Sequence, residues 1–253
     1  MIERIVPGSE MWNQAIAEHI VRYRFASRFV SGKRVLDAGC GVGYGSRVLA
    51  DSGAAEVLGV DVSRDALEIA EKQYGCERVK FLCDDCQMLR QVQGPFDAVV
   101  SFEALEHFAD GESFVERVSQ LLSPDGMFIV STPNKIFSRG DNPYHMREYT
   151  PAEFRTLLQQ CFSHITLLGQ HETAGSSGLG QLASALWSNP FVRLGRLLQR
   201  LSGKKVGWPL NNILSTESDF VISDLYPDAA RTLLAVCRRE HGAEEARLRN
   251  VSS

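Results

Sequence analysis

The sequence predicts a single α/β domain, in which a mostly parallel sheet of seven strands carries helices on both faces. Short runs rich in apolar and β-branched residues alternate along the chain with amphipathic stretches at helical spacing, a pattern typical of a doubly wound sheet. The chain has 253 residues, of which 44% are hydrophobic, and this is enough for one large core. Neither an internal repeat nor a low-complexity segment interrupts the alternation.

Each predicted element follows from its local pattern. A leading helix is expected where apolar side chains recur at helical spacing near the N-terminus. Four more helices are expected, at residues 44–52, 63–74, 112–122 and 151–161. Ser63 is a suitable N-cap for the second of these. The predicted strands are 34–37, 56–61, 79–83, 96–101, 127–131, 164–169 and 232–238.

A late segment breaks this alternation. The chain is expected to consist of the leading helix (11–30), a core (33–170 and 216–238), an insertion (171–215) and a polar tail (239–253). So late an insertion favours a lid or a substrate wall. Trp187 and Trp208 flank a basic amphipathic stretch within it. These two tryptophans are expected to pack against a lid helix or, alternatively, to stack on the faces of sugar rings.

Bulk properties exclude several classes of protein. The net charge of −4 lacks the basic excess that a partner such as duplex nucleic acid requires. No run approaches the roughly 20 apolar residues of a membrane span, and no signal peptide is visible, so we expect a soluble, cytoplasmic protein. Six scattered cysteines do not form a disulfide framework. Cys83 and Cys86 have zinc-like spacing, but no second pair completes four ligands.

A glycine-rich loop after the first predicted strand is the strongest functional signal. The strand ends at Asp37, and Gly39, Gly41, Gly43 and Gly45 follow before a helix. Glycines let a backbone turn sharply and approach a ligand closely. A dinucleotide binder has G-x-G-x-x-G with phosphate at the helix N-terminus, whereas this loop reads D-x-G-x-G-x-G. The carboxylate would repel a diphosphate and attract the ammonium of an amino acid.

Carboxylates also end the next two predicted strands. Asp61 is placed to accept both hydroxyls of a ribose. Asp84 and Asp85 suit the amino group of adenine. An amino acid, a ribose and an adenine thus each have a partner, and a phosphate has none.

These features resemble the class I S-adenosylmethionine-dependent methyltransferases, in the type 11 methyltransferase domain group, over about residues 18–238. The resemblance implies a Rossmann-like fold and S-adenosylmethionine as the cofactor. It places Tyr23 over the cofactor's carboxylate, and Asp85 at the adenine with Cys86 beside it. The implied cofactor-binding residues are Tyr23, Asp37, Gly39, Gly41, Asp61, Asp85, Cys86 and Ser101.

A second constellation follows the fourth predicted strand, which borders the reaction centre of such a sheet. Glu103, Glu106 and His107 converge if a helical turn follows the strand, because residues i and i+3 share a face. Two carboxylates and an imidazole suit a divalent cation. Alternatively, the Glu-His pair orients the loop without any metal.

A later histidine strengthens the metal interpretation. His145 begins a His-x-x-Glu-aromatic-Thr segment that resembles the small-RNA 3′-terminal 2′-O-methyltransferases, and the ubiquinone-pathway O-methyltransferases resemble the first half of the pattern. The resemblance implies Mg²⁺, or another divalent cation, bound by Glu103, Glu106, His107 and His145. The catalytic candidates are Glu103, His107 and His145, and a histidine that is not a ligand would be the general base. Alternatively, His145 only packs the loop.

The favoured reaction is O-methylation of a saccharide hydroxyl. An aliphatic hydroxyl ionises reluctantly, and a cation can favour its alkoxide while holding two neighbouring oxygens of a diol. Residues 131–135 and 145–149 also resemble bacterial methyltransferases that act on saccharides and glycoconjugates. The alternatives are a phenolic, quinone-type or polyketide-type acceptor, then an RNA end, and, from another class, a non-catalytic cofactor-binding subunit.

Overall fold

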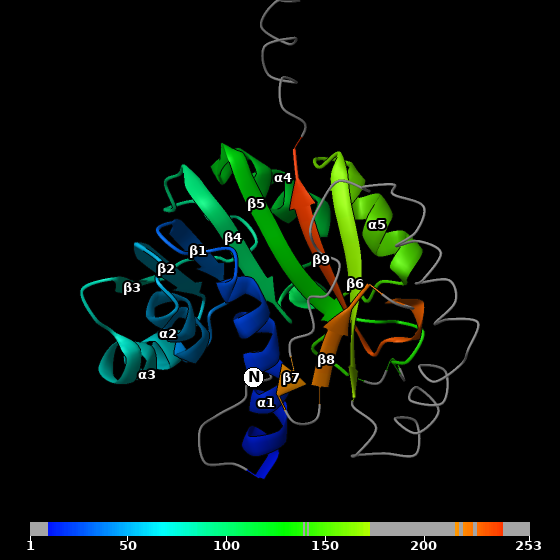
Figure 1. The fold of residues 1–253 in the computed structure, drawn as a ribbon, viewed down its shortest axis with the longest axis horizontal. Helices are drawn as coiled ribbons and strands as arrows, with labels where there is room; N and C mark the ends of the chain where they lie inside the picture. The colour runs from blue at the N-terminus through cyan, green and yellow to red at the C-terminus, as the bar shows by residue number, and fades with distance from the viewer. Residues whose placement is uncertain are drawn as a thin grey trace, which may run out of the picture.

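A computed structural model describes residues 10–138, 140, 142–172, 216–217, 220–224 and 227–239. Residues 173–215 of the predicted insertion, with Trp187, Trp208 and the basic stretch, lie outside the described residues, as does the tail from 240 onward. The described part of the chain is a nine-stranded sheet with helices on both faces (Figure 1).

The sheet is doubly wound as predicted, in the order β3-β2-β1-β4-β5-β9-β6-β8-β7. Strands β1 to β5 run parallel, and β9 lies antiparallel between β5 and β6. The loops after β1, β2, β3, β4, β5 and β6 therefore leave at one edge. The strands are β1 Arg34–Ala38, β2 Glu56–Asp61, β3 Val79–Cys83, β4 Phe96–Phe102, β5 Leu122–Pro133, β6 His164–Glu172, β7 Thr216–Glu217, β8 Phe220–Ser223 and β9 Thr232–Arg238.

Side-chain caps fix where three helices begin. Ser63 Oγ accepts a hydrogen bond from the backbone nitrogen of Ala66 at 3.2 Å, as predicted for this cap. Asp110 caps the next helix in the same way, and Thr150 forms a reciprocal capping box with Glu153. The helices are α1 Glu10–Ser27, α2 Tyr44–Asp51, α3 Arg64–Tyr74, α4 Gly111–Leu121 and α5 Pro151–Gln159, with the 3₁₀ turns η1 Leu105–His107 and η2 Pro227–Ala229.

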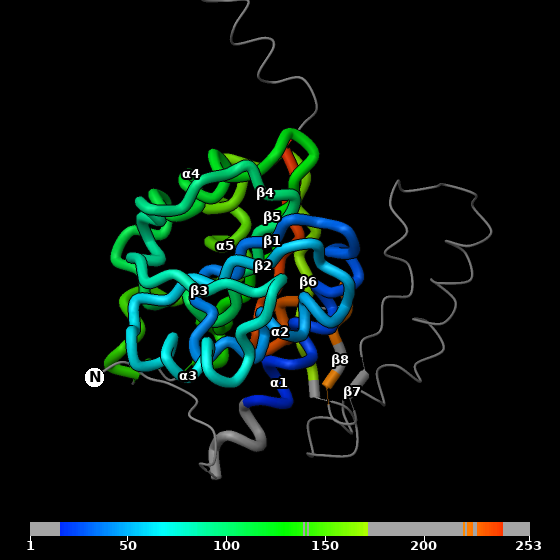
Figure 2. Tube along the Cα trace, turned by 90° about the vertical axis from the view of Figure 1, so that its left-hand side faces the viewer, coloured from blue at the N-terminus to red at the C-terminus, as the bar shows by residue number. Residues whose placement is uncertain are grey.

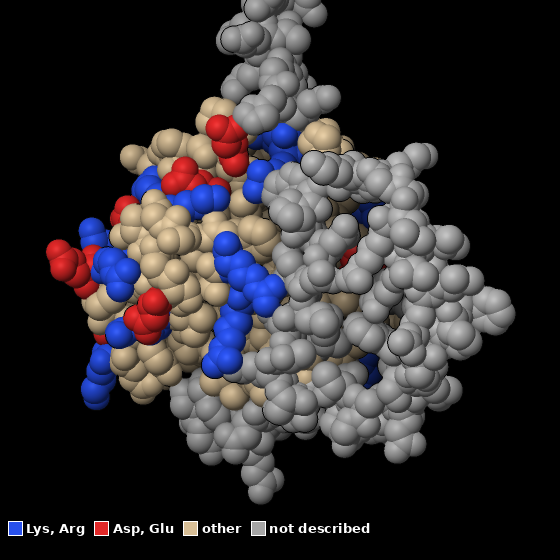
Figure 3. All heavy atoms as spheres, in the orientation of Figure 1, with Lys and Arg blue, Asp and Glu red and all other residues tan. Residues whose placement is uncertain are grey.

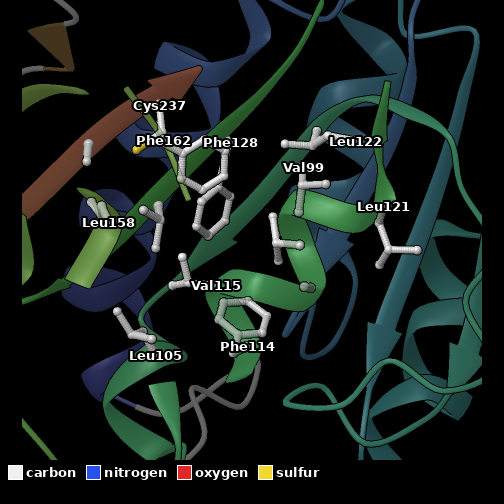
Figure 4. Packing of buried hydrophobic residues seen from close by; sticks show 14 of the residues in the cluster. Val99, Leu105, Phe114, Val115, Leu121, Leu122, Phe128, Leu158, Phe162 and Cys237 are labelled. Carbon is white, nitrogen blue, oxygen red and sulfur yellow. The ribbon is translucent and has the colours of Figure 1, made fainter. Parts of the chain in front are cut away.

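Two hydrophobic layers hold the sheet between its helices. One layer packs α4 and α5 on one face, and the other packs α1 and α2 on the opposite face. Figure 1 shows α1 in front of the strands and α4 behind them, and Figure 2 looks from the β3 edge. In the first layer (Figure 4), the Phe128 ring lies 6.0 Å from that of Phe114 and 5.8 Å from that of Phe162. The strands are thereby fixed, and their loops form the site.

Several boundaries differ from the predictions: β5 begins at Leu122 rather than at residue 127, and α1 and α5 end three and two residues early. Three further differences concern the last strands and the tail. The sheet has nine described strands where seven were expected, because β6 continues through His171 and Glu172 and gives β8 an edge for pairing. These two residues belong to the predicted insertion, 171–215. Arg239, assigned to the tail, donates from Nη2 to the carbonyl oxygens of Leu122 at 2.9 Å and Ser123 at 2.8 Å. All three differences come from long-range pairings that no local pattern encodes.

The surface gives limited information about partners. On the face shown in Figure 3, acidic and basic side chains intermingle on the left, while basic side chains gather near the middle. Within the described ranges, no helix is long and apolar enough to cross a bilayer. The expectation that the protein binds no duplex nucleic acid stays a prediction.

Candidate active site

The loop between β1 and α2 turns through three glycines with positive φ, which is 84° at Gly39, 55° at Gly41 and 87° at Gly43. A β-carbon on Gly39 would stand 2.8 Å from that of Ala104, and one on Gly43 would meet the Phe81 ring at 2.6 Å. A β-carbon on Gly41 would meet nothing within 4 Å, so the backbone torsion alone requires glycine there. The loop is therefore packed tightly on one side and open at Gly41.

Asp37 lies beneath this loop. Its carboxylate is fully buried and accepts hydrogen bonds from Ser46 Oγ at 2.6 Å and from the Tyr23 hydroxyl at 3.1 Å. Burial raises the pKa of this carboxyl to about 7, although both hydrogen bonds oppose the shift. The Tyr23 hydroxyl, which the resemblance places over the cofactor's carboxylate, points to Asp37. The structure thus joins these two predicted residues to each other through a direct hydrogen bond.

Asp37 should make the stability of the ligand-free protein depend on pH. Its pKa is about 7 in the folded protein and about 3.8 without the protein's influence. Between these values the folded state holds more protons than the unfolded state, so the free energy of unfolding falls as pH rises from about 4 to about 7. The contribution of the Asp37 carboxyl to the free energy of unfolding is fully present below about pH 4 and is lost above about pH 7.

Asp37→Asn, which stays neutral, should flatten this dependence by roughly 1 to 3 kcal/mol between about pH 5 and pH 8. Urea unfolding of both proteins at the two pH values measures the difference. An equal pH dependence in the two proteins would show that the buried carboxyl does not titrate in this range.

Asp61 ends β2 and ties two loops together. Its Oδ2 accepts a hydrogen bond from the backbone nitrogen of Gly41, and its Oδ1 accepts one from that of Ser63, both at 2.9 Å. The side chain is partly exposed, and each carboxylate oxygen has a second lone pair. The geometry therefore leaves acceptor capacity for the two hydroxyls of a ribose.

The two aspartates that follow β3 differ in exposure. Asp84 is buried and accepts a hydrogen bond from the backbone nitrogen of Gln91 at 2.7 Å. Asp85 is exposed. Cys86 is buried, and its thiol donates to the carbonyl oxygen of Val60 at 3.5 Å. Of the two aspartates that the sequence offers to an adenine, only Asp85 is accessible.

A buried guanidinium near the loop escapes prediction from sequence. Arg22 of α1 is 1% exposed, and its Nη1 donates to Gln170 Oε1 at 2.7 Å. Its Nε has no hydrogen-bond partner among the described residues. It also acts electrostatically on Tyr44, the first residue of α2. The hydroxyl of Ser101, a predicted cofactor-binding residue, is likewise buried without a described partner.

Three side chains of the second constellation converge beyond β4 and β5. Glu106, His107 and His145 each place a potential ligand atom within 4.8 Å of the others. We call these three residues the His-Glu cluster. Glu106 is 1% exposed and accepts a hydrogen bond from the Thr132 hydroxyl at 3.1 Å. Burial and, after it, the charge of Glu103 raise the pKa of Glu106 well above its ordinary value.

Glu103, the fourth predicted ligand, stands outside the cluster. Its φ is 51°, and its Oε1 accepts a hydrogen bond from Ser131 Oγ at 2.7 Å. The helical turn that would place Glu103 and Glu106 on one face begins only at Leu105. Glu103 therefore precedes the turn and shares no helical face with Glu106, although its charge still acts on that carboxyl.

Long-range backbone contacts bring His145 to the cluster. The carbonyl oxygen of Glu106 accepts a hydrogen bond from the backbone nitrogen of Met146 at 2.8 Å. His107 Nδ1 lies 2.9 Å from the carbonyl oxygen of Tyr144. Because a carbonyl only accepts, Nδ1 of His107 carries a proton, and in the neutral imidazole Nε2 then keeps its lone pair.

Two polar residues beside His145 also escape prediction. Glu148 Oε1 lies 2.6 Å from His145 Nδ1, and Asn142 Nδ2 lies 2.9 Å from His145 Nε2. Burial acts to raise the pKa of Glu148, but hydrogen bonds from Ser138 and His145 outweigh it, and the pKa lies below its usual value. The signal in the sequence that could have predicted the role of Glu148 is the His-x-x-Glu spacing from His145.

The fold and the first site together define a class of protein. A doubly wound sheet with a tightly turned glycine loop, a partly exposed carboxylate ending β2 and an exposed one after β3 is the arrangement of class I S-adenosylmethionine-dependent methyltransferases. The chain belongs to the methyltransferase domain family, whose model matches residues 29–207. It is therefore an enzyme that uses S-adenosylmethionine.

Known proteins agree with this assignment. The chain is 36% identical over 183 residues to a Mycolicibacterium smegmatis protein named a probable S-adenosylmethionine-dependent methyltransferase, and the match covers 70% of each chain. It is 37% identical over 114 residues to the ubiquinone biosynthesis O-methyltransferase of Neisseria meningitidis, covering 41% of this chain and 45% of that one.

A solved structure supports the fold. It is a chain of the complex between the Haloferax volcanii Trm112 methyltransferase activator and a methyltransferase. The TM-score is 0.60 at 20% identity, and the match covers 90% of this chain and 93% of that one. Identity this low bears on the fold alone.

Proposed function

We propose that this methyltransferase acts on a hydroxyl of a saccharide or glycoconjugate and uses a divalent cation, Mg²⁺ or a similar ion, at the His-Glu cluster. The observation that carries the proposal is the convergence of Glu106, His107 and His145 within 4.8 Å. The cluster lies beyond the carboxyl ends of β4 and β5, where ligands of such sheets bind.

The donor set fits a divalent cation. One carboxylate and two imidazoles are ligand types that such ions accept. The buried carboxylate of Glu106 would be stabilised by a neighbouring positive charge. When bound, the cation would favour the alkoxide of an aliphatic hydroxyl. Glu103 remains a proposed fourth ligand or catalytic group, and a histidine that is not a ligand is the proposed general base.

The proposed cofactor contacts lie on the other loops of the same edge. Asp61 would accept the ribose hydroxyls, and Asp85 would accept a hydrogen bond from the adenine amino group. Arg22, a buried cation without an ion-pair partner among the described residues, would compensate the cofactor's carboxylate. Holding methyl donor and acceptor in line accounts for much of the acceleration expected for this transfer.

A saccharide suits this cluster because neighbouring hydroxyls on a sugar ring offer two oxygens to one cation. A second candidate is a phenolic or quinol acceptor, which the name of the Neisseria meningitidis relative supports. Large apolar side chains are exposed on the two loop segments that flank the cluster, and they suit an acceptor with an apolar part. They are Ile136, Phe137, Tyr144 and Met146. A phenol ionises near pH 10 and needs less activation than an aliphatic hydroxyl.

An acceptor screen with methyl-labelled S-adenosylmethionine tests both candidates. We expect a saccharide to be labelled, with activity falling at least about 10-fold in EDTA and returning on addition of Mg²⁺, because the hydroxyl depends on the cation. Labelling of phenols alone, insensitive to EDTA, would establish the second candidate. Labelling of RNA ends alone would contradict both.

A further inference from the structure

We propose that Glu148 is a positioning residue, which fixes His145 in the tautomer that presents Nε2 to a cation. The inference rests on the proposed metal site and extends it to residues that act through His145. It is carried by the orientation of one amide and by two short contacts to one carboxylate oxygen.

The orientation of Asn142 identifies the tautomer. Asn142 Oδ1 accepts a hydrogen bond from the backbone nitrogen of Tyr144 at 3.0 Å. With its oxygen engaged there, the amide turns its donor, Nδ2, toward His145 Nε2 at 2.9 Å. A donor facing Nε2 requires a lone pair on that nitrogen, so the neutral imidazole carries its proton on Nδ1.

The Glu148 carboxylate accepts the hydrogen bond that the Nδ1–H group of His145 donates. Its Oε1 lies 2.6 Å from His145 Nδ1, and the two side chains are only 10% and 15% exposed, respectively. Ser138 Oγ donates to the same oxygen at 2.7 Å, which holds the carboxylate from a second side. A carboxylate that accepts an imidazole N–H fixes the ring and makes the opposite nitrogen a better ligand.

The same loop orients both histidines of the cluster. The backbone nitrogen of Tyr144 holds Asn142, and its carbonyl oxygen holds His107 Nδ1. In their neutral forms, both imidazoles therefore keep their lone pair on Nε2. A cation that binds His145 takes the place of the Asn142 amide at that nitrogen.

Manganese binding to the full chain, measured from the electron paramagnetic resonance signal of free Mn²⁺, tests this role. Glu148→Gln should weaken Mn²⁺ binding about 10- to 100-fold, because the glutamine amide can donate to Nδ1 and shift the proton to Nε2. Ser138→Ala, which removes one of the two contacts to Glu148, should weaken it about 5-fold. Glu112→Gln is the matched control, since this exposed carboxylate pairs with Arg147 at 3.0 Å and does not contact His145.

A second readout does not depend on any metal. Long-range ¹H–¹⁵N spectra of the imidazole rings should show His145 as the Nδ1–H tautomer in the metal-free wild type, and a substantial Nε2–H population in a folded Glu148→Gln protein. The inference about Glu148 would be overturned if His145 of the wild type carried its proton on Nε2, or if Glu148→Gln bound Mn²⁺ within twofold of the wild-type affinity. Either result would leave the proposed metal site standing. Failure of the wild type to bind Mn²⁺ would overturn the proposed metal site and the inference together.

Discussion

Asp61→Ala should weaken S-adenosylmethionine binding by about 100-fold or more. The carboxylate is the proposed acceptor for both ribose hydroxyls, and hydrogen bonds to a charged group contribute about 1.5 to 3 kcal/mol each. The same carboxylate holds the backbone nitrogens of Gly41 and Ser63, so its loss also loosens the glycine loop. Isothermal titration of the purified variant with S-adenosylmethionine measures the effect.

Two further variants separate ribose binding from a general loss of structure. Asp61→Asn keeps the size of the side chain but replaces one acceptor oxygen with a donor, so it should also bind poorly while remaining folded. Asp65→Asn alters an exposed aspartate in the first turn of α3 and should bind like the wild type. Affinity of Asp61→Ala within a few fold of the wild type would contradict the assignment of the ribose site.

His107→Asn should lower kcat by about 100-fold or more while leaving S-adenosylmethionine affinity unchanged. Replacing a residue that only supports a metal ligand already costs about 10- to 100-fold, and loss of a ligand should cost at least as much. Asparagine removes Nε2 but keeps a donor that can reach the Tyr144 carbonyl oxygen, which His107 Nδ1 now holds at 2.9 Å. Steady-state kinetics with the acceptor found by the screen, together with cofactor titration, measure the two quantities.

His164→Ala provides the histidine control, because this exposed residue begins β6 and lies at the opposite end of that strand from the site loops. It should retain wild-type kcat. If His107→Asn remained as active as this control, neither metal binding nor proton transfer by His107 would be required. A fall in cofactor affinity equal to the fall in kcat would instead indicate collapse of the site.

The two expected effects concern loops that leave one edge of the sheet, after β2 and after β4, with β1 between these strands. The charge of Glu103 acts on both Tyr44 at the start of α2 and Glu106 in the His-Glu cluster. This placement is consistent with its proposed catalytic role.

Much of the fold followed from local patterns. Five of the strands predicted from short β-branched runs lie side by side in parallel, and Ser63 caps α3 as its position suggested. The glycine loop could also be predicted from the sequence, because backbone with positive φ and close packing tolerates few residue types other than glycine. The extension of β6 to Glu172 and the anchoring of Arg239 were not, since each depends on a partner distant in sequence.

Strand periodicity, the glycine spacing and the acidic strand ends are properties of a few consecutive residues, and their resemblance to a known family indicated the class of enzyme. Which side chains meet became clear from the three-dimensional fold. It buries Asp37 beneath the loop, leaves Glu103, whose φ is 51°, outside the cluster, and brings His145 to Glu106 and His107. Backbone preference and burial pattern act over short stretches of the chain. Distances between functional groups depend instead on torsions at single residues and on hydrogen bonds between distant segments, such as that from Met146 to Glu106.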